Sequence, residues 1–173
     1  MLRSESRNRR TNRRPGEHAL QHWVFAYGSN MDLDDLAQWC GARGEQLTLL
    51  ETRVGELPAH RLVWNYHSEA RGGGAANVEA GGSRPLPGLL LQTNGKGLAL
   101  LDRKEGHPRR YRRELASVVS QGEAIEAWVY RVLPEFIQSR VVLPTPTYVQ
   151  ILLRAARRWE LPEWHREELR ALL

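Results

Sequence analysis

The sequence predicts an α+β protein in which a mixed sheet or small β-barrel is combined with a few helices. Three observations lead to this prediction. The chain has 173 residues and 41% hydrophobic content, which suits one domain with a single sizeable core. Six or seven segments have the short apolar or alternating pattern of β-strands. Only a few segments combine helical spacing with capping residues.

The first half of the chain begins with strand-like segments. Residues 22–27 form an apolar run that predicts a buried strand, and Asp32 can then cap a helix that ends near Gly41. Residues 46–57 and 60–65 alternate apolar and polar side chains. We therefore expect these two segments to pair as antiparallel strands joined by a tight connection.

The middle of the chain is rich in glycine between residues 66 and 87. Such a segment is either a mobile surface loop or a loop that must approach another part of the protein closely, and the sequence favours the first. Residues 88–93 predict a further strand. Asn94 can cap a short helix that stops at Gly106, which puts Glu105 in its last turn.

The last third of the chain combines a hairpin with two helices. Residues 112–120 and 124–133 flank a short polar segment whose length and composition suit a β-hairpin. Thr145 as N-cap and Pro146 at the first helical position predict a helix. A proline at residue 162 ends this helical pattern before a short final helix.

The N-terminal segment differs from the rest of the chain in composition. Residues 1–17 hold six arginines against two glutamates and have few apolar side chains, so we expect residues 1–20 to form a disordered basic tail before a folded domain at 21–173. Arginines could neutralise phosphates. Because no aromatic side chain is interleaved with them to stack on bases, nucleic-acid binding is not the favoured interpretation.

Other composition features limit the location and partners of the protein. No secretory segment and no apolar stretch of about 20 residues is present, so we expect a cytoplasmic protein without membrane insertion. The lone Cys40 excludes an intramolecular disulfide and is expected in the core. The six tryptophans could form an apolar surface for a homodimer, but core burial explains them equally well.

Two short motifs carry the chemistry. An apolar strand ends in Tyr27-Gly28-Ser29-Asn30, where a glycine between small polar residues can turn backbone N–H groups toward one point as an anion cradle. The later segment Leu101-Asp102-Arg103-Lys104-Glu105-Gly106 supplies a carboxylate at a helix end. Taken singly, the first is also ordinary turn chemistry and the second a charged surface run.

Together the two motifs resemble the signature of the gamma-glutamylcyclotransferases, within the AIG2-like superfamily: an F-A-Y-G-S-N strand-to-loop segment and a later L-D-x-x-E-G. The resemblance extends through residues 61–65, 72–77 and 144–148 and covers roughly residue 22 to the C-terminus. It implies a closed β-barrel with helices around it.

The resemblance also implies a reaction. In this family the alpha-amine of a gamma-glutamyl group attacks its own gamma-carbonyl, which gives 5-oxoproline and a free amine or amino acid. The nucleophile belongs to the substrate, so no cofactor or metal is expected, and the chain has neither an HExxH nor a CxxC motif. The reaction needs a folded-back substrate and one group that moves a proton.

The resemblance assigns roles to particular residues. Glu105 is the expected general acid/base, and the helix end and burial are expected to raise its pKa. Backbone N–H groups of the glycine loop would hold a carboxylate or an oxyanion. Tyr111 is expected to line the pocket, although a core aromatic is equally consistent. The expected substrate-binding residues are Phe25, Ala26, Tyr27, Gly28, Ser29, Asn30 and Tyr111.

Two alternatives concern the substrate and the class of function. Asn30 and the Pro-x-Pro-x-Tyr segment at 144–148 favour gamma-glutamyl amino acids over glutathione or gamma-glutamylamines, whose enzymes typically carry Y-G-S-L or Y-G-T-L. A different class would be a non-catalytic module that binds a small carboxylate or the acidic terminus of a protein. The presence of Glu105 argues against that module.

Overall fold

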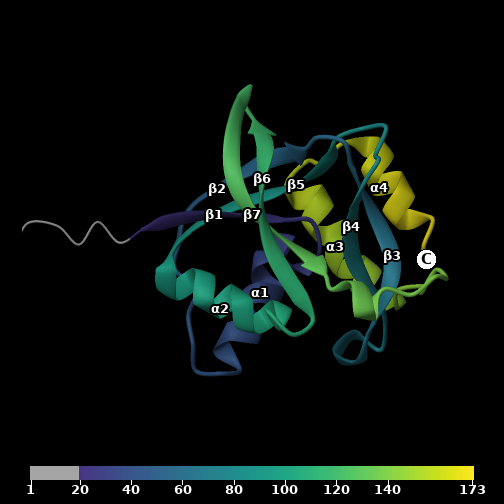
Figure 1. The fold of residues 1–173 in the computed structure, drawn as a ribbon, viewed down its shortest axis with the longest axis horizontal. Coiled ribbons are helices and arrows are strands. Elements are labelled where there is room, and N and C mark those ends of the chain that lie inside the picture. The colour runs from purple at the N-terminus through teal and green to yellow at the C-terminus, as the bar shows by residue number, and fades with distance from the viewer. Residues whose placement is uncertain (1–19) are drawn as a thin grey trace, which may run out of the picture.

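The computed structural model describes residues 20–173, and its centre is a closed five-stranded barrel with the strand order β1-β5-β2-β6-β7 (Figure 1). Strand β1 pairs antiparallel with β5 and parallel with β7, and the parallel pair closes the barrel. The expected mixed barrel is therefore confirmed. The barrel strands are β1 (Gln21–Ala26), β2 (Leu49–Leu57), β5 (Leu86–Asn94), β6 (Tyr111–Ser120) and β7 (Glu123–Val132).

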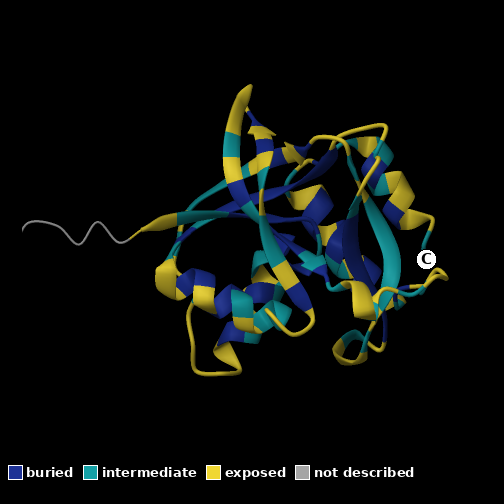
Figure 2. Ribbon diagram, viewed as in Figure 1, coloured by how far each residue is buried: buried dark blue, intermediate teal, exposed yellow. Residues whose placement is uncertain are grey.

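Strand β5 is the most apolar strand because it lies between β1 and β2 and is covered on both faces. Its consecutive residues Leu89, Leu90 and Leu91 are all fully buried. Successive side chains of a strand point to opposite faces. Accordingly, Leu89 and Leu91 belong to one hydrophobic cluster and Leu90 to the other, and Figure 2 shows β5 as a largely buried strand.

Four α-helices accompany the strands within residues 20–173, and local capping explains their starts. The side chains of Asp32, Asn94 and Thr145 each accept a hydrogen bond from a backbone N–H two or three residues later, as N-caps do. The predicted helix starts are confirmed. The helices are α1 (Leu33–Gly41), α2 (Gly95–Glu105), α3 (Pro146–Arg158) and α4 (Glu163–Arg170). In Figure 1, α3 packs beside α4, and α2 lies near α1, where Lys104 of α2 contacts Asp35 and Trp39 of α1.

Strands β3 (His60–Ser68) and β4 (Gly73–Ala80) form a separate two-stranded antiparallel sheet. The expected pairing of residues 46–57 with 60–65 is wrong, because β2 pairs with β5 and β6 instead. At the turn between β2 and β3, Ala59 has a φ of 54°, and its carbonyl accepts hydrogen bonds from residues 81 and 82 at the end of β4. The turn is thus tied to β4, and β3 leaves the barrel.

The glycine-rich segment is mostly strand rather than a surface loop, so the favoured prediction for residues 66–87 is also wrong. Its glycines serve close backbone packing. The N–H of Gly74 donates a 2.8 Å hydrogen bond to the carbonyl of Leu143, and a Cβ at residue 74 would lie 1.9 Å from the carbonyl oxygen of Val142. A side chain there would prevent this contact.

The hairpin of β6 and β7 confirms the predicted pair, with a register from Tyr111↔Val132 to Ser120↔Glu123. Its two-residue turn, Gln121 and Gly122, has φ values of 52° and 81°, as a tight hairpin requires. The hairpin tip is exposed (Figure 2). Short 3-10 helices occur at η1 (Ser29–Met31), η2 (Glu69–Arg71) and η3 (Pro134–Phe136).

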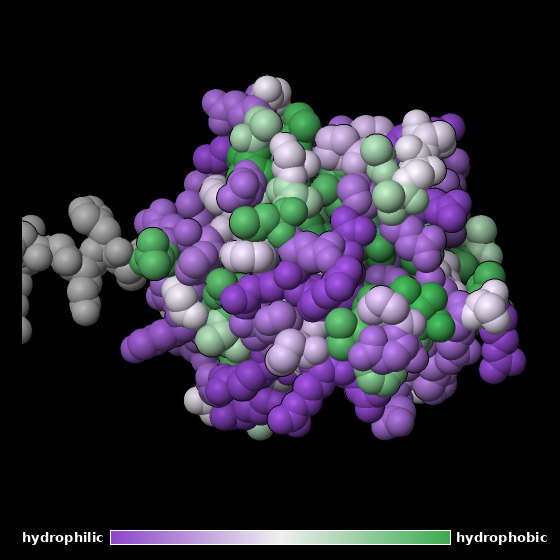
Figure 3. All heavy atoms as spheres, in the orientation of Figure 1, coloured by the Kyte–Doolittle hydropathy of each residue, from purple (hydrophilic) through white to green (hydrophobic). Residues whose placement is uncertain are grey.

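The tryptophans are neither fully buried nor fully exposed: all six are half-buried. Arginine guanidinium groups cover several of their faces, which shields apolar surface at low cost in hydration. Hydrophobic residues on the face in Figure 3 accordingly occur in small groups between hydrophilic ones. The covered pairs are Trp39 with Arg43, Trp23 with Arg53, Trp164 with Arg84, Trp128 with Arg113 and Trp159 with Arg158.

The expected basic tail at residues 1–20 lies, except for its last residue, outside the described residues, so that prediction and the domain bounds that depend on it stay predictions. Between residues 20 and 173, none of the helices is both long and apolar enough to cross a membrane. Cys40 is buried in the core, as expected.

Candidate active site

The loop after β1 forms one wall of the candidate site. The strand ends at Ala26 and the chain turns into η1, so Ser29 and Asn30 are buried although both are polar. The turn is closed by 3.0 Å hydrogen bonds from the N–H groups of Met31 and Asp32. The N–H groups of Gly28 and Asn30 take no part in these bonds, as expected for the first turn of a helix, and the N–H of Ser29 faces the hydroxyl of Tyr148.

Gly28 has little space around it. A Cβ at this position would lie 3.2 Å from the hydroxyl oxygen of Tyr148 and 3.3 Å from the Cβ of Ala76. The loop therefore packs closely against both α3 and β4, and glycine permits that approach.

Glu105 reaches the same loop from the end of α2. The helix stops there because Gly106 adopts a left-handed conformation with a φ of 68°. The side-chain amide Nδ2 of Asn30 donates a 2.7 Å hydrogen bond to Oε1 of Glu105. Burial raises the pKa of the Glu105 carboxyl above its usual value, although Lys104, the Asn30 hydrogen bond and Arg71 oppose that rise. The expected direction of the pKa shift is confirmed.

A cavity of about 40 Å³, here called the inner cavity, lies between these two elements. Every residue that the sequence proposed for the site lines this cavity. The structure thus brings the eight residues together, while their roles in binding and catalysis stay predictions. The lining residues are Val24, Phe25, Ala26, Tyr27, Gly28, Ser29, Asn30, Ala76, Glu105, Tyr111, Tyr130 and Tyr148.

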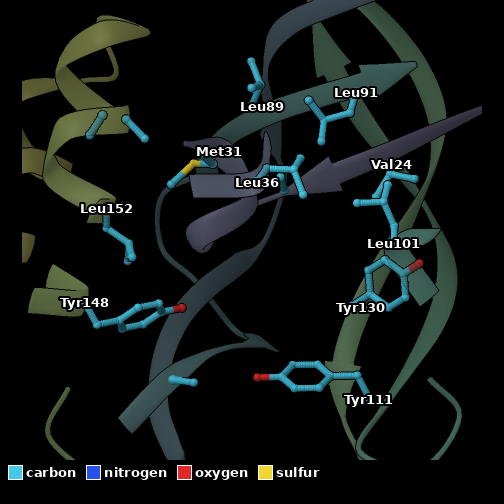
Figure 4. Packing of buried hydrophobic residues seen from close by; sticks show 14 of the residues in the cluster. Val24, Met31, Leu36, Leu89, Leu91, Leu101, Tyr111, Tyr130, Tyr148 and Leu152 are labelled. Carbon is cyan, nitrogen blue, oxygen red and sulfur yellow. The ribbon is translucent and has the colours of Figure 1, made fainter. Parts of the chain in front are cut away.

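Four tyrosines from different elements give the inner cavity its aromatic wall. Tyr111 and Tyr148 direct their hydroxyl groups toward the same region from β6 and α3 (Figure 4). The hydroxyl of Tyr111 donates a 3.1 Å hydrogen bond to the carbonyl of Ala76, and the hydroxyl of Tyr27 donates one of 2.5 Å to the carbonyl of Tyr130. Burial raises the pKa values of all four phenols, which keeps them protonated.

A larger groove of about 840 Å³, here called the outer groove, adjoins the inner cavity. Ser29, Glu105, Tyr111 and Tyr148 line both spaces. Aromatic and charged side chains line the rest of the groove, including Trp39, Tyr66, Phe136, Arg71, Lys104 and Arg110. A ligand in the inner cavity can therefore extend into a wider, mixed surface.

Asp102 lies outside both the inner cavity and the outer groove. Its carboxylate accepts a 2.7 Å hydrogen bond from the hydroxyl of Tyr130 and pairs with Arg113. Asp102 therefore holds one tyrosine of the cavity wall in position and does not form a carboxylate pair with Glu105.

Sequence reasoning missed several residues of the site. Tyr148 ends the Pro-x-Pro-x-Tyr segment, but its helical spacing suits core packing equally well. Tyr130 follows the alternation of an ordinary strand, and Arg71 lies in the segment expected to be a loop. No local pattern identifies these three, because only the tertiary fold brings them to the cavity. Among residues 20–173, no three or more His, Cys, Asp or Glu side chains gather as metal ligands would.

Comparison with known proteins supports the same fold. The family model described as gamma-glutamyl cyclotransferase, AIG2-like, matches residues 24–150. No curated protein matches the chain in sequence.

Solved structures resemble the barrel and its helices closely in shape. One, described as a gamma-glutamyl cyclotransferase, is 22% identical with a TM-score of 0.73 over 88% of each chain. A human protein described as uncharacterised is 22% identical with a TM-score of 0.72 over 87% of each chain. A yeast gamma-glutamyl cyclotransferase specific to glutathione is 12% identical, with a TM-score of 0.63 over 88% of this chain and 94% of its own. These likenesses concern the fold.

Proposed function

The chain belongs to the AIG2-like gamma-glutamyl cyclotransferase family, and from this premise we propose that it converts a gamma-glutamyl amino acid or amide to 5-oxoproline and the free amine. The alpha-amine of the glutamyl group forms a bond to its own gamma-carbonyl carbon, and the amide C–N bond at that carbon breaks. The protein must hold the substrate in this folded conformation, because proximity alone can contribute on the order of 7 to 11 kcal/mol.

The position of Glu105 is the observation that carries the proposal. Its carboxyl lies at the junction of the inner cavity and the outer groove and is hydrogen-bonded to Asn30. Burial raises its pKa, so the carboxylate is a better proton acceptor than an ordinary surface glutamate. In the proposed reaction Glu105 takes a proton from the substrate's alpha-ammonium and later gives it to the leaving nitrogen.

The loop at residues 28–30 is proposed to stabilise the negative charge that develops during attack. The backbone N–H groups of Gly28 and Asn30 are not used in closing the turn of η1, so they are proposed as preorganised donors, whereas the N–H of Ser29 faces the hydroxyl of Tyr148. The neutral phenols of Tyr111 and Tyr148 flank the same space. Tyr111, Phe25, Ala26 and Tyr27 are proposed to shape the wall against which the glutamyl chain folds.

The outer groove is proposed to take the leaving group. It adjoins the inner cavity at Glu105, where the leaving nitrogen must receive its proton, and its volume suits an amino acid or a short peptide. Gamma-glutamyl amino acids are therefore the proposed substrate class. Cytoplasmic localisation and homodimer formation stay predictions of the sequence.

Release of 5-oxoproline from gamma-glutamyl amino acids, glutathione and gamma-glutamyl-lysine tests the proposal. Glu105→Gln keeps the shape of the side chain and removes the base, so kcat/KM should fall roughly 100- to 10,000-fold. Glu167→Gln, on the exposed side of α4, is the matched control and should leave turnover unchanged. Full activity of Glu105→Gln would refute the assignment. Binding of 5-oxoproline without any turnover would instead support the non-catalytic binding module.

A further inference from the structure

Two cationic side chains converge on one hydroxyl group beside the inner cavity. Nη2 of Arg71 lies 3.1 Å from Oγ of Ser29, and Nζ of Lys104 lies 3.5 Å from the same atom. Arg71 comes from η2 after β3, and Lys104 comes from the last turn of α2 beside Glu105. Two distant segments thus bring positive charge to the loop at residues 28–30.

The two cations share one ion-pair partner. Asp35 of α1 lies 3.0 Å from Arg71 and 4.0 Å from Lys104. The carboxyl of Glu105 is a second acidic group near both cations, because each of them lowers its pKa. The Lys104 side chain is only 6% exposed. On the side of Ser29 both cations face only a neutral hydroxyl group, so their N–H groups there can donate to the carboxylate of a ligand.

Arg71 is also fixed in direction. Its guanidinium carbon lies 5.2 Å from the ring centre of Tyr148, as in a cation–π contact. The contact with Asp35 holds the other side of the group. An arginine held in this way can present its N–H groups to a carboxylate with little loss of conformational freedom.

The adjacent residue, Asn30, offers a hydrogen-bond acceptor beside these two cationic donors. Its Oδ1 is buried and has no hydrogen-bond partner within residues 20–173, while its Nδ2 is bonded to Glu105. Buried polar atoms normally have partners, so an unpaired acceptor in a cavity wall can accept a hydrogen bond from a donor of a ligand. Cations and acceptors thus flank each other across Ser29 and Asn30.

We propose that Arg71 and Lys104 bind the alpha-carboxylate of the glutamyl group, with its alpha-ammonium directed toward Asn30 and Glu105. This inference rests on the proposed function and refines it. The carboxylate binds the two side-chain cations, and the backbone N–H groups of Gly28 and Asn30 are left for the gamma-carbonyl oxygen. The substrate class is therefore gamma-glutamyl compounds whose alpha-carboxylate is free.

Calorimetric binding of 5-oxoproline and of its carboxamide tests this carboxylate site without requiring turnover. The two compounds differ only in the charged group. Wild-type protein should prefer the acid roughly 10- to 100-fold, the range expected for hydrogen bonds to a charged group. In Arg71→Gln and in Lys104→Gln, the ratio of the affinity for the acid to that for the amide should fall close to one. Arg71→Lys, which keeps the charge, should retain part of the preference.

Arg158→Gln is the matched control, because Arg158 also pairs with a carboxylate of α1 but lies on the surface away from both cavities. It should leave the preference unchanged. Three results would overturn the carboxylate site. Wild type could bind the acid and the amide equally, or it could fail to bind the acid at millimolar concentration. The third result is that folded Arg71→Gln and Lys104→Gln keep the full preference for the acid. If wild type releases 5-oxoproline from its substrate but does not prefer the acid over the amide, the proposed function stands without the carboxylate site. If wild type prefers the acid but shows no turnover, the carboxylate site stands without the proposed function.

Discussion

The side-chain amide of Asn30 donates a 2.7 Å hydrogen bond to Glu105 across 75 residues of sequence. The barrel explains this contact. Strand β5 runs antiparallel to β1, and α2 follows β5 directly and turns back along β1. Six strand residues and eleven helix residues span similar lengths, about 20 and 16 Å. The end of α2 therefore arrives beside the loop that follows β1.

Replacing Asn30 should change how the rate depends on pH. Asn30→Ala removes a hydrogen bond that lowers the pKa of Glu105, so that pKa should rise. Because the proposed base works deprotonated, the acidic limb of the kcat/KM profile should move to higher pH. The rate at the optimum should fall roughly 10- to 100-fold, as the carboxylate loses a charged hydrogen bond.

The pair of Asn65 and Glu79 provides the control, since it has the same 2.7 Å amide-to-carboxylate bond and lies outside both cavities. Asn65→Ala should leave the acidic limb where it is. An unmoved limb in Asn30→Ala would mean that Glu105 is not the group whose titration controls the rate.

The parts of the fold that could be predicted from the sequence are those with local causes. Asp32, Asn94 and Thr145 cap helices through hydrogen bonds that reach two or three residues along the chain. The β6–β7 hairpin is fixed by a two-residue turn with positive φ values. Such contacts are present in any short window of sequence, so composition and spacing reveal them.

The partner of a strand has no such local cause. Alternation of apolar and polar residues in 46–57 and 60–65 specifies which face is buried but not which strand lies alongside. The separation of β3 from the barrel depends on the hydrogen bonds of Ala59 with the end of β4, more than 20 residues later. The same limit applies to the site: residues 25–30 and Glu105 belong to recognisable motifs, whereas Arg71 reaches Ser29 only through the tertiary fold.

The peptide group of Ala76 depends on a tyrosine rather than on a strand neighbour. The register of β3 and β4 shifts between Val63 and Tyr66, so Ala76 has no paired residue in β3. The hydroxyl of Tyr111 bonds its carbonyl instead. Tyr111→Phe leaves a buried acceptor unpaired and should lower the free energy of unfolding by roughly 1–3 kcal/mol in urea titration.

Tyr66→Phe is the comparison for this variant. The ring of Tyr66 packs edge-on against that of Tyr111, with 5.4 Å between the ring centres. Because the Tyr66 side chain is only half-buried, water can replace the contacts of the Tyr66 hydroxyl. The free energy of unfolding should change by less than about 0.5 kcal/mol. Equal losses in both variants would show that the bond to Ala76 makes no special contribution.

Gly88 should not tolerate a side chain. It lies in β5 between β1 and β2, where a Cβ would be 2.4 Å from the carbonyl oxygen of Ala26 and 2.6 Å from the ring of Phe25. Gly88→Ala should therefore lower the free energy of unfolding by roughly 1–3 kcal/mol or more. Gly95→Ala, seven residues later in open space, should be neutral or stabilise by up to about 1 kcal/mol. Thermal unfolding of the two variants compares them directly, and an equally stable Gly88→Ala would contradict the packing of β1 on β5.

His165 should make the protein less stable in acid. Its side chain is 1% exposed in α4, and neither ring nitrogen has a partner within residues 20–173. Burial lowers its pKa from 6.5 to about 4. Between these two values the unfolded chain binds a proton that the folded protein excludes, so the free energy of unfolding decreases as the pH falls through that range. The full effect is roughly 3 kcal/mol, present at low pH and absent above about pH 6.5.

Urea titrations of wild type and His165→Leu between pH 7 and 4 measure this contribution. Leucine is similar in size and cannot be protonated, so the variant should lose less stability than wild type over the same range. His60 lies near the surface with Nε2 facing Arg131, so His60→Leu serves as a control that removes a histidine outside the core. If wild type and His165→Leu lose stability in parallel, the acid sensitivity originates from the carboxylates that pair with arginines on the surface.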